Sequence, residues 1–376
     1  MIYLDNAATS HPKPEAVYTR VDEILRHISG NPGRASHAMA VEASRVIFSA
    51  RESLARLVGA PDSSRVAFTK NATEAINVAL KGALAPGDHL VTTTFEHNSV
   101  AKTAARLESS GVEVTRLAPG PDGRLDPQEV DGALKDNTRL VCLTHASNVF
   151  GVIQPVAEIA GVCKRRGVLL MVDGAQTVGA VPVNVEVVGI DMLAGTGHKA
   201  LFGPQGTGFL YVREGVELQP LVDGGTGEMD TVLEMPERLE AGTMNTPGVG
   251  GLGAGVDFVL AEGVEMIRAR EVTLIARLID GLGAIERVAL LGPPGSEGRV
   301  SLLSFTIEGV SPADAGTRLD EGFGIMVRTG THCAPDAHRT IGTFPEGTIR
   351  VSPGYFNTPE DIDAFVSAVE AIAALG

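Results

Sequence analysis

Two short runs in the middle of the chain are apolar at almost every position, and they constrain the fold more than any other feature. They are RLVCLTH at residues 139–145 and GVLLMVDGAQ at residues 167–176. A strand with one face in water alternates apolar and polar residues, whereas a strand covered by helices on both faces is continuously apolar. We therefore expect both runs to be central strands of a mostly parallel sheet.

The chain around these runs alternates between strand-like and helix-like patterns. From residue 65 to about residue 213 it contains RVAFTK, NATEAINVALKGAL, HLVTTTF and a helical pattern near residues 98–110. This alternation is typical of β-α-β units and predicts an α/β fold. Ligands of such sheets bind at the carboxyl ends of the strands, so the polar residues that follow each strand are candidates for a site.

The last third of the chain has a different pattern. A Gly-rich stretch after residue 213 lacks clear periodicity and is expected to be a loop-rich crossing between domains. Beyond it we predict helices at 248–261, 263–282, 312–320 and 359–373, and strands at 300–307 and 347–352. The expected organisation is a large domain at residues 15–250 and a small α+β domain at residues 251–376 together with residues 1–14.

Composition excludes several classes of protein. The 376 residues are 44% hydrophobic and 20% charged, which is typical of a globular chain. Lys and Arg number 31 against 46 Asp and Glu, so the formal charge of −15 repels nucleic acid and anionic membrane surfaces. Because the start of the chain does not resemble a leader and no run approaches 18 apolar residues, we expect a cytoplasmic protein without a membrane or nucleic-acid partner.

The three cysteines are too few and too scattered for a disulfide framework or a zinc site, so no metal is expected. Cys142 lies in an apolar strand-like run and Cys163 in a helical pattern, and both are expected to be inert buried thiols. Cys333 differs, because it lies in the polar, turn-rich segment RTGTHCAPDAH.

Two strand ends carry groups that suit a cofactor with an anionic phosphate and a positively charged ring nitrogen. Asn71 opens a helix with Glu74 three residues on, a capping-box spacing, and the free N–H groups of such a helix start can hold a phosphate. Asp173 ends a buried strand, where an unpaired carboxylate is costly and a protonated pyridine nitrogen is a suitable partner. Taken alone, each feature is more simply interpreted as an ordinary helix cap.

Two further strand ends carry groups that suit catalysis. Lys199 follows the strand-like run IDMLAGTGHK, and a desolvated pocket there would lower the pKa of its amine, as a nucleophile or base requires. His97, in TTTFEHNSV, could stack on a flat cofactor or move protons. A surface lysine and a structural histidine are the alternatives. The coincidence of all four groups at one sheet edge favours a cofactor site.

The chain resembles the cysteine desulfurase family of class V aminotransferase-fold enzymes, closest to its selenocysteine-lyase-like branch. The resemblance covers nearly the whole chain and rests on YLDNAAT at 3–9, NATEAIN at 71–77, EH at 96–97, HASNVFG at 145–151, VDGAQ at 172–176, TGHK at 196–199, EAGTMN at 240–245, RTGTHC at 328–333 and RVSPGYFNT at 350–358. It implies fold type I of the pyridoxal-phosphate-dependent transferases, which is aspartate-aminotransferase-like.

The resemblance also implies roles for individual residues. Lys199 would carry pyridoxal phosphate as a Schiff base and act as the catalytic base, with Asp173 on the pyridine nitrogen and His97 stacked on the ring. Gln176 would approach the phenolic oxygen. The phosphate would be held by Ala72, Thr73, Thr196 and His198 and, from the other subunit of a homodimer, by Thr243. Substrate would be bound by Asn148, Arg350 and, in an N-terminal segment that keeps only part of the branch's motif, Arg34.

Cys333 aligns with the family's sulfur-accepting nucleophile. The implied reaction converts L-cysteine to L-alanine and leaves a persulfide on Cys333, which supplies sulfur to an acceptor protein for iron–sulfur cluster or related biosynthesis. Selenocysteine lyase activity, another aminotransferase or carbon–sulfur lyase activity of the same fold, and a non-catalytic cofactor-binding protein are the alternatives. His338 is a further candidate proton donor, with a surface role as its alternative.

Overall fold

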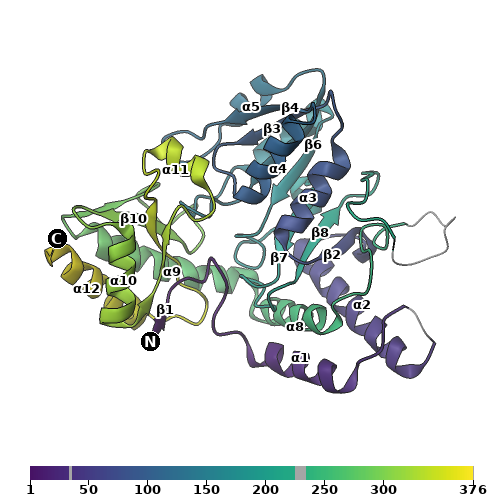
Figure 1. Cartoon of the computed structure of the whole chain (residues 1–376), viewed down its shortest axis with the longest axis horizontal. Coiled ribbons are helices and arrows are strands. Elements are labelled where there is room, and N and C mark those ends of the chain that lie inside the picture. The colour runs from purple at the N-terminus through teal and green to yellow at the C-terminus, as the bar shows by residue number, and fades with distance from the viewer. Residues whose placement is uncertain (34–35, 225–233, 376) are drawn as a thin grey trace.

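The computed structural model describes residues 1–33, 36–224 and 234–375, and a seven-stranded sheet forms its centre (Figure 1). The strand order is β2 (Val66–Thr69), β8 (Gly208–Val212), β7 (Met192–Thr196), β6 (Leu169–Asp173), β5 (Thr138–Thr144), β3 (His89–Thr93) and β4 (Glu113–Leu117). β8 runs antiparallel to both of its neighbours, β2 and β7, and the other neighbouring strands of this sheet are parallel. The prediction of a mostly parallel sheet with the two apolar runs at its centre is therefore confirmed.

Helices cover both faces of this sheet, which explains why its strands are continuously apolar. On one face α3 (Ala72–Ala83) and α4 (Asn98–Glu108) pack on one set of strand side chains, including Leu140 and Met171. On the other face the alternate set, including Val141 and Leu170, packs on α2 (Ala38–Val58), α5 (Pro127–Ala133), α6 (Val156–Arg166), α7 (Val185–Val188) and α8 (Thr246–Glu262).

The glycines of α8 let it lie buried between the sheet and the N-terminal helices. A Cβ at Gly250 would lie 2.1 Å from Ile24 of α1 (Glu15–His27), and one at Gly253 would lie 2.9 Å from Ala50 of α2. Small residues in the sequence TPGVGGLGAG thus allow close helix packing, and α8 separates α1 from the sheet in Figure 1.

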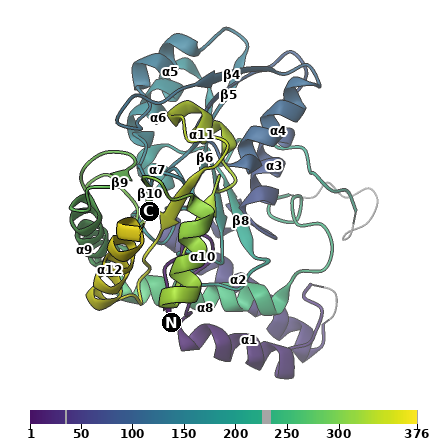
Figure 2. The same ribbon diagram turned by 60° about the vertical axis from the view of Figure 1, so that its left-hand side comes forward.

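The C-terminal part has its own sheet and its own core. The antiparallel strands lie in the order β12 (Arg328–Gly330), β13 (Thr348–Val351), β10 (Leu303–Ile307) and β9 (Val288–Leu290). Figure 2 shows α9 (Val264–Gly283), α10 (Pro312–Phe323) and α12 (Pro359–Leu375) beside this sheet, and all three contribute to one apolar cluster. Leu4 joins that cluster, next to the short parallel pair of β1 (Ile2–Tyr3) and β11 (Ile325–Met326).

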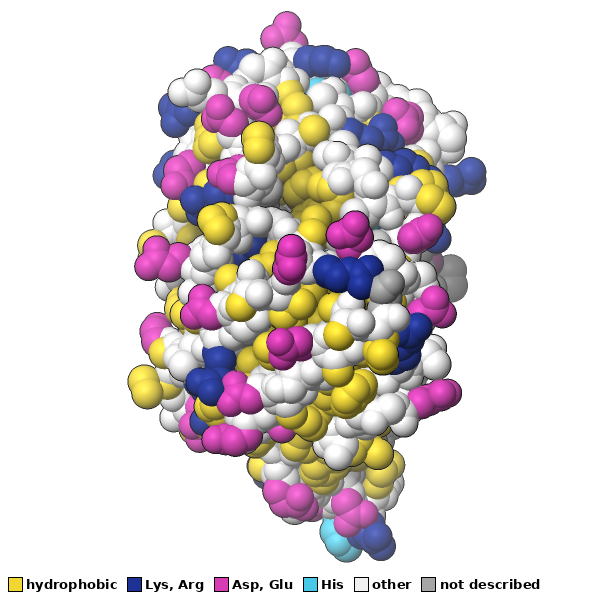
Figure 3. All heavy atoms as spheres, turned by 90° about the vertical axis from the view of Figure 1, so that its left-hand side faces the viewer, with side chains coloured by type: hydrophobic (Ala, Val, Ile, Leu, Met, Phe, Trp, Pro, Cys, Tyr) yellow, Lys and Arg dark blue, Asp and Glu magenta, His cyan; other side chains and the backbone are white. Residues whose placement is uncertain are grey.

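The predicted elements of the last third are present with shifted ends. The domain boundary predicted at residue 250 lies within α8, and the two-domain division stays a prediction. In the described part of the chain, no helix combines the length and the apolar character needed to span a bilayer. Acidic and basic side chains are interspersed with apolar ones over the face of the C-terminal part (Figure 3).

Candidate active site

The ends of five strands meet at one edge of the large sheet and surround a cavity of about 180 Å³. Because β2, β3, β5, β6 and β7 all point the same way, their carboxyl ends share this edge. The cavity brings together most of the predicted site residues, namely Ala72, Thr73, His97, Asn148, Asp173, Gln176, Thr196, His198, Lys199 and Arg350. The predicted convergence at a sheet edge is thus what the structure shows, while the role of each residue stays a prediction.

Lys199 lies three residues beyond the end of β7 and lines the cavity. Burial lowers the pKa of its amine to about 8; Asp173 and Cys333 oppose the shift, and Arg350 and Arg328 add to it. A larger fraction of this amine is neutral near neutral pH than in an ordinary lysine, so it can act as a nucleophile and base.

Asp173 is the last residue of β6 and is 4% exposed. Its Oδ1 accepts a hydrogen bond from the Ala175 N–H at 2.9 Å, and burial raises the pKa of the carboxyl. A cationic partner in the cavity would stabilise the charged form of this carboxylate. A protonated pyridine nitrogen is such a partner.

Thr196 and His198, which line the same cavity, each carry a buried polar atom that has no hydrogen-bond partner within the described residues. These atoms are Thr196 Oγ1 and His198 Nδ1. Ala72 and Thr73, which also line the cavity, open α3, where the first N–H groups of the helix have no intrahelical acceptor. These groups together fit a bound phosphate, and with Asp173 and Lys199 they fit pyridoxal phosphate.

His97 is the N-cap of α4, and its ring is held in one orientation. Nδ1 accepts from the Ser99 N–H at 3.1 Å and lies 2.8 Å from Ser99 Oγ. Burial, together with the nearby cations Lys199, Arg328 and Arg350, lowers its pKa to about 4. The imidazole is therefore neutral near pH 7, with its proton on Nε2.

Arg350, in β13, is 1% exposed and is fixed by two contacts. Nη2 lies 2.8 Å from Asp5 Oδ1, and Nη1 donates to the Asn148 carbonyl at 3.0 Å. Its Nε has no partner within the described residues. The guanidinium is therefore held in place before substrate arrives, in the wall of the cavity.

Cys333 lies beside the cavity on a short, well-anchored turn. His332 and Cys333 have φ values of 49° and 62°, in the left-handed region that non-glycine residues seldom adopt. The turn is held by Asn148 Nδ2, which donates to the His332 carbonyl at 2.6 Å, and by the Asn98 N–H, which donates to the Cys333 carbonyl at 2.8 Å. Asn148 thus orients the cysteine turn as well as lining the cavity.

The sulfur of Cys333 faces a cation that the sequence reasoning did not single out. Arg328 lines the cavity and its Nη2 is 3.1 Å from Cys333 Sγ. Arg328 also pairs in register with Arg350 across β12 and β13, so two guanidinium groups stand at one wall. Arg328 is the first residue of the segment RTGTHC, so the sequence motif could have pointed to it. Its proximity to Arg350 follows only from the antiparallel register of the two strands.

The remaining predicted residues lie elsewhere or have other contacts. Gln176 Nε2 donates to the Ala7 carbonyl at 3.2 Å. Thr243 lines a separate cavity with Lys70, Leu221 and Val222. Arg34 lies outside the described residues.

The surface alternative for His338 is wrong, because this side chain is fully buried. Cys142 and Cys163 are buried as predicted.

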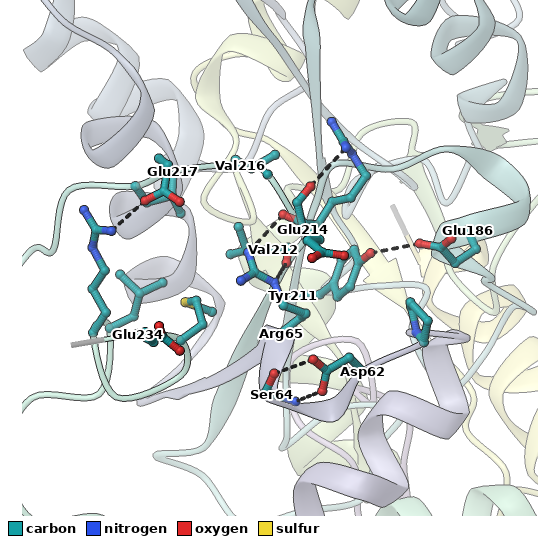
Figure 4. A pocket seen from close by; sticks show the side chains of 17 residues that line it. Asp62, Ser64, Arg65, Glu186, Tyr211, Val212, Glu214, Val216, Glu217 and Glu234 are labelled. Carbon is teal, nitrogen blue, oxygen red and sulfur yellow. Dashed lines mark hydrogen bonds and ion pairs between the residues drawn. The ribbon is translucent and has the colours of Figure 1, made fainter. Parts of the chain in front are cut away.

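A hollow of about 900 Å³, larger than the cavity at the strand ends, lies at the opposite edge of the sheet (Figure 4). Its charged and polar side chains bond mainly to one another, as in the pair Arg238–Glu217 at 2.6 Å and the Tyr211 hydroxyl with Glu186 at 3.3 Å. Size alone therefore does not identify the site.

The whole chain is similar to known proteins. Residues 2–365 match the family described as aminotransferase class V. The chain belongs to this family. Members of the class V aminotransferase family depend on pyridoxal phosphate, which agrees with the fit of the cavity to that cofactor.

Several relatives of this class V family member are similar to it over the whole of this chain and most of their own length. A probable cysteine desulfurase of Methanothermobacter thermautotrophicus is 36% identical, over 100% of this chain and 95% of the relative. The cysteine desulfurase of Haloferax volcanii is 34% identical, over 100% and 90%. The apo structure of the cysteine desulfurase of Thermococcus onnurineus has a TM-score of 0.94 at 33% identity and covers 100% of this chain and 95% of that one.

Proposed function

We propose that this protein is a cysteine desulfurase, which converts L-cysteine to L-alanine and receives the sulfur on Cys333. The observation that carries the proposal is the anchored Cys333 turn, whose sulfur is 3.1 Å from Arg328 in the wall of the cavity that holds Lys199. Relatives that span the whole chain are named cysteine desulfurases, which supports the same conclusion.

Pyridoxal phosphate, when bound, supplies an electron sink that acidifies the substrate's Cα–H bond. Lys199 would hold the cofactor, and its amine would take the substrate's α-proton. Thr196, His198 and the start of α3 would bind the phosphate, and Asp173 would keep the ring nitrogen charged. His97 is neutral near pH 7 and would lie against the cofactor's ring.

Arg350 orients the substrate by its α-carboxylate. Arg350 lines the cavity, its Nη groups are fixed by Asp5 and Asn148, and its Nε has no partner within the described residues. Guanidinium groups bind carboxylates through two parallel hydrogen bonds. With the carboxylate held there and the amine at Lys199, the substrate's side chain is directed to the wall where Arg328 and Cys333 lie.

Sulfur transfer is a displacement at the substrate's sulfur atom. The Cys333 thiolate gives an electron pair to that sulfur, a new S–S bond forms, and the Cβ–S bond breaks with its electrons left on carbon. Cβ then takes a proton, which completes the methyl group, and Lys199 returns a proton to Cα, which completes alanine. Arg328 Nη2, 3.1 Å from Cys333 Sγ, would stabilise the thiolate that attacks.

The test is incubation with L-cysteine followed by assay of alanine, sulfide and pyruvate. We expect alanine and a persulfide at Cys333, and the substitution Cys333→Ser should stop sulfur transfer. Pyruvate as the main product, or unchanged sulfur transfer in Cys333→Ser, would contradict the proposal. A parallel assay with L-selenocysteine tests the lyase alternative, since selenium release need not depend on Cys333.

The working unit that we propose is a homodimer, with a sulfur-acceptor protein as partner and a cytoplasmic location. Thr243 shares a surface cavity with Leu221 and Val222, which are 39% and 57% exposed, as suits a position that reaches a second subunit. Cys333 is half-exposed, so an acceptor can approach it. Three unpaired cysteines suit a reducing compartment.

A further inference from the structure

Lys199 forms part of the wall of a second cavity, which lies between the large sheet and the C-terminal part. This cavity has about 50 Å³, and it shares Ala7, Gln176 and Lys199 with the candidate active site. Its other walls include Glu271 from α9 and Ser301 near the start of β10. The two cavities thus meet at the residue that the proposed function makes the base.

Glu271 is a buried carboxyl that the fold does not use. It is 6% exposed, and it forms no hydrogen bond or ion pair within the described residues. Burial raises its pKa to about 8, which Arg268 on the same helix opposes. The charged group that acts on its pKa is Arg268, on its own helix, and the titratable residues Lys199 and Tyr355 line the same cavity.

Ser301 is a second unsatisfied group in the same wall. It is 8% exposed, and its Oγ has no hydrogen-bond partner in the part of the chain that the structure describes. A buried carboxyl or hydroxyl without a partner is costly, and ordered water is the usual way to satisfy such groups. The cavity has room for a few water molecules.

We propose that this second cavity holds ordered water that passes protons between Glu271 and the Lys199 amine. The inference rests on the proposed function, in which Lys199 takes the substrate's α-proton. The Lys199 ammonium then gives a proton to a cavity water while that water gives one to the Glu271 carboxylate, and the reverse transfer restores both groups. Glu271 never touches substrate, so it is a positioning residue that acts through Lys199.

The first test follows the α-proton of L-alanine in D₂O by NMR. Alanine has no sulfur to transfer, so this exchange reports Lys199 without Cys333. We expect Glu271→Gln to slow exchange about tenfold, while the cofactor's absorbance and the melting temperature stay unchanged. Glu265→Gln, an exposed carboxyl on the same helix, is the matched control and should exchange at the wild-type rate.

The second test uses the apoprotein and therefore does not depend on turnover. The pH midpoint for acylation of Lys199 by acetic anhydride should fall by about half a unit in Glu271→Gln, because an anionic neighbour stabilises the ammonium form. A merely structural Glu271 would leave this midpoint in place. If Glu271→Gln folds poorly, Ser301→Ala serves as the second variant. It should slow exchange of the α-proton of L-alanine and should still bind the cofactor as the wild-type protein does.

The outcomes separate the two proposals. Wild-type exchange and an unshifted midpoint in well-folded Glu271→Gln, or wild-type exchange in Ser301→Ala, would overturn the role of the second cavity and leave the proposed function in place. Absence of alanine exchange in the wild-type protein would instead overturn the role of Lys199 in the proposed function.

Discussion

Two hollows at opposite edges of the same sheet differ in how their polar groups are satisfied. The groove of about 900 Å³ in Figure 4 is lined by groups that bond to one another, among them Arg238 with Glu217 and Asp62 with Ser64. The cavity of about 180 Å³ contains buried atoms without partners and groups whose pKa values are shifted by burial. Unpartnered polar atoms and groups with shifted pKa values therefore identify the active site, and the volume of the hollow does not.

Removal of the Lys199 amine, which lines the small cavity, is expected to reduce enzyme activity more than any other change considered. The substitution Lys199→Ala removes both the attachment point of the cofactor and the base, so alanine formation should fall by at least about 10³-fold. The measurement is alanine formed from L-cysteine, together with the absorbance of bound cofactor. If Lys199→Ala stays active while its spectrum shows only unbound cofactor, the small cavity is not the active site and the contrast with the large groove fails.

Replacement of the Arg350 guanidinium, which lines the same cavity, is expected to have the next largest effect on activity. Arg350→Lys keeps a positive charge but loses the planar, two-bond geometry, so the KM for L-cysteine should rise about 10- to 100-fold, the equivalent of a charged hydrogen bond. Because Arg350 also holds Asp5 at 2.8 Å, the melting temperature must be measured in parallel. An unchanged KM would show that the carboxylate binds elsewhere.

The pH dependence of cofactor loading should report the burial of Lys199. Its folded pKa of about 8 lies below the ordinary lysine value, so the neutral amine accumulates as pH rises through 8. We expect the rate of loading by the apoprotein to rise about tenfold per unit below pH 8 and to level off above it. A rate that keeps rising to pH 10 would mean an ordinary exposed amine. Stopped-flow absorbance measures it.

Changes in the large groove should have the smallest effect. Glu217 is 78% exposed, so Glu217→Gln breaks only a surface ion pair and should change the free energy of unfolding by at most about 1 kcal/mol. We expect kcat and KM for L-cysteine to stay at wild-type values. A clear loss of activity in this variant would give the groove a function that its paired charges do not suggest.

The sequence predicted the sheet and the residues at the strand ends, because strand ends of one direction must meet at one edge. It could not predict contacts that depend on register or on distant segments. Arg328 meets Arg350 through antiparallel pairing, and Asn148 reaches His332 across 184 positions of the chain. Glu271 also escaped notice, because a lone Glu in a helical pattern is normally a surface residue.

The most direct test of the account is a single turnover with L-cysteine, followed by mass analysis of the peptide that contains Cys333 and quantification of alanine. We predict one added sulfur atom on Cys333 and one alanine per active site, in the wild-type protein and in Glu217→Gln alike. Alanine or pyruvate formed while Cys333 stays unmodified would contradict it.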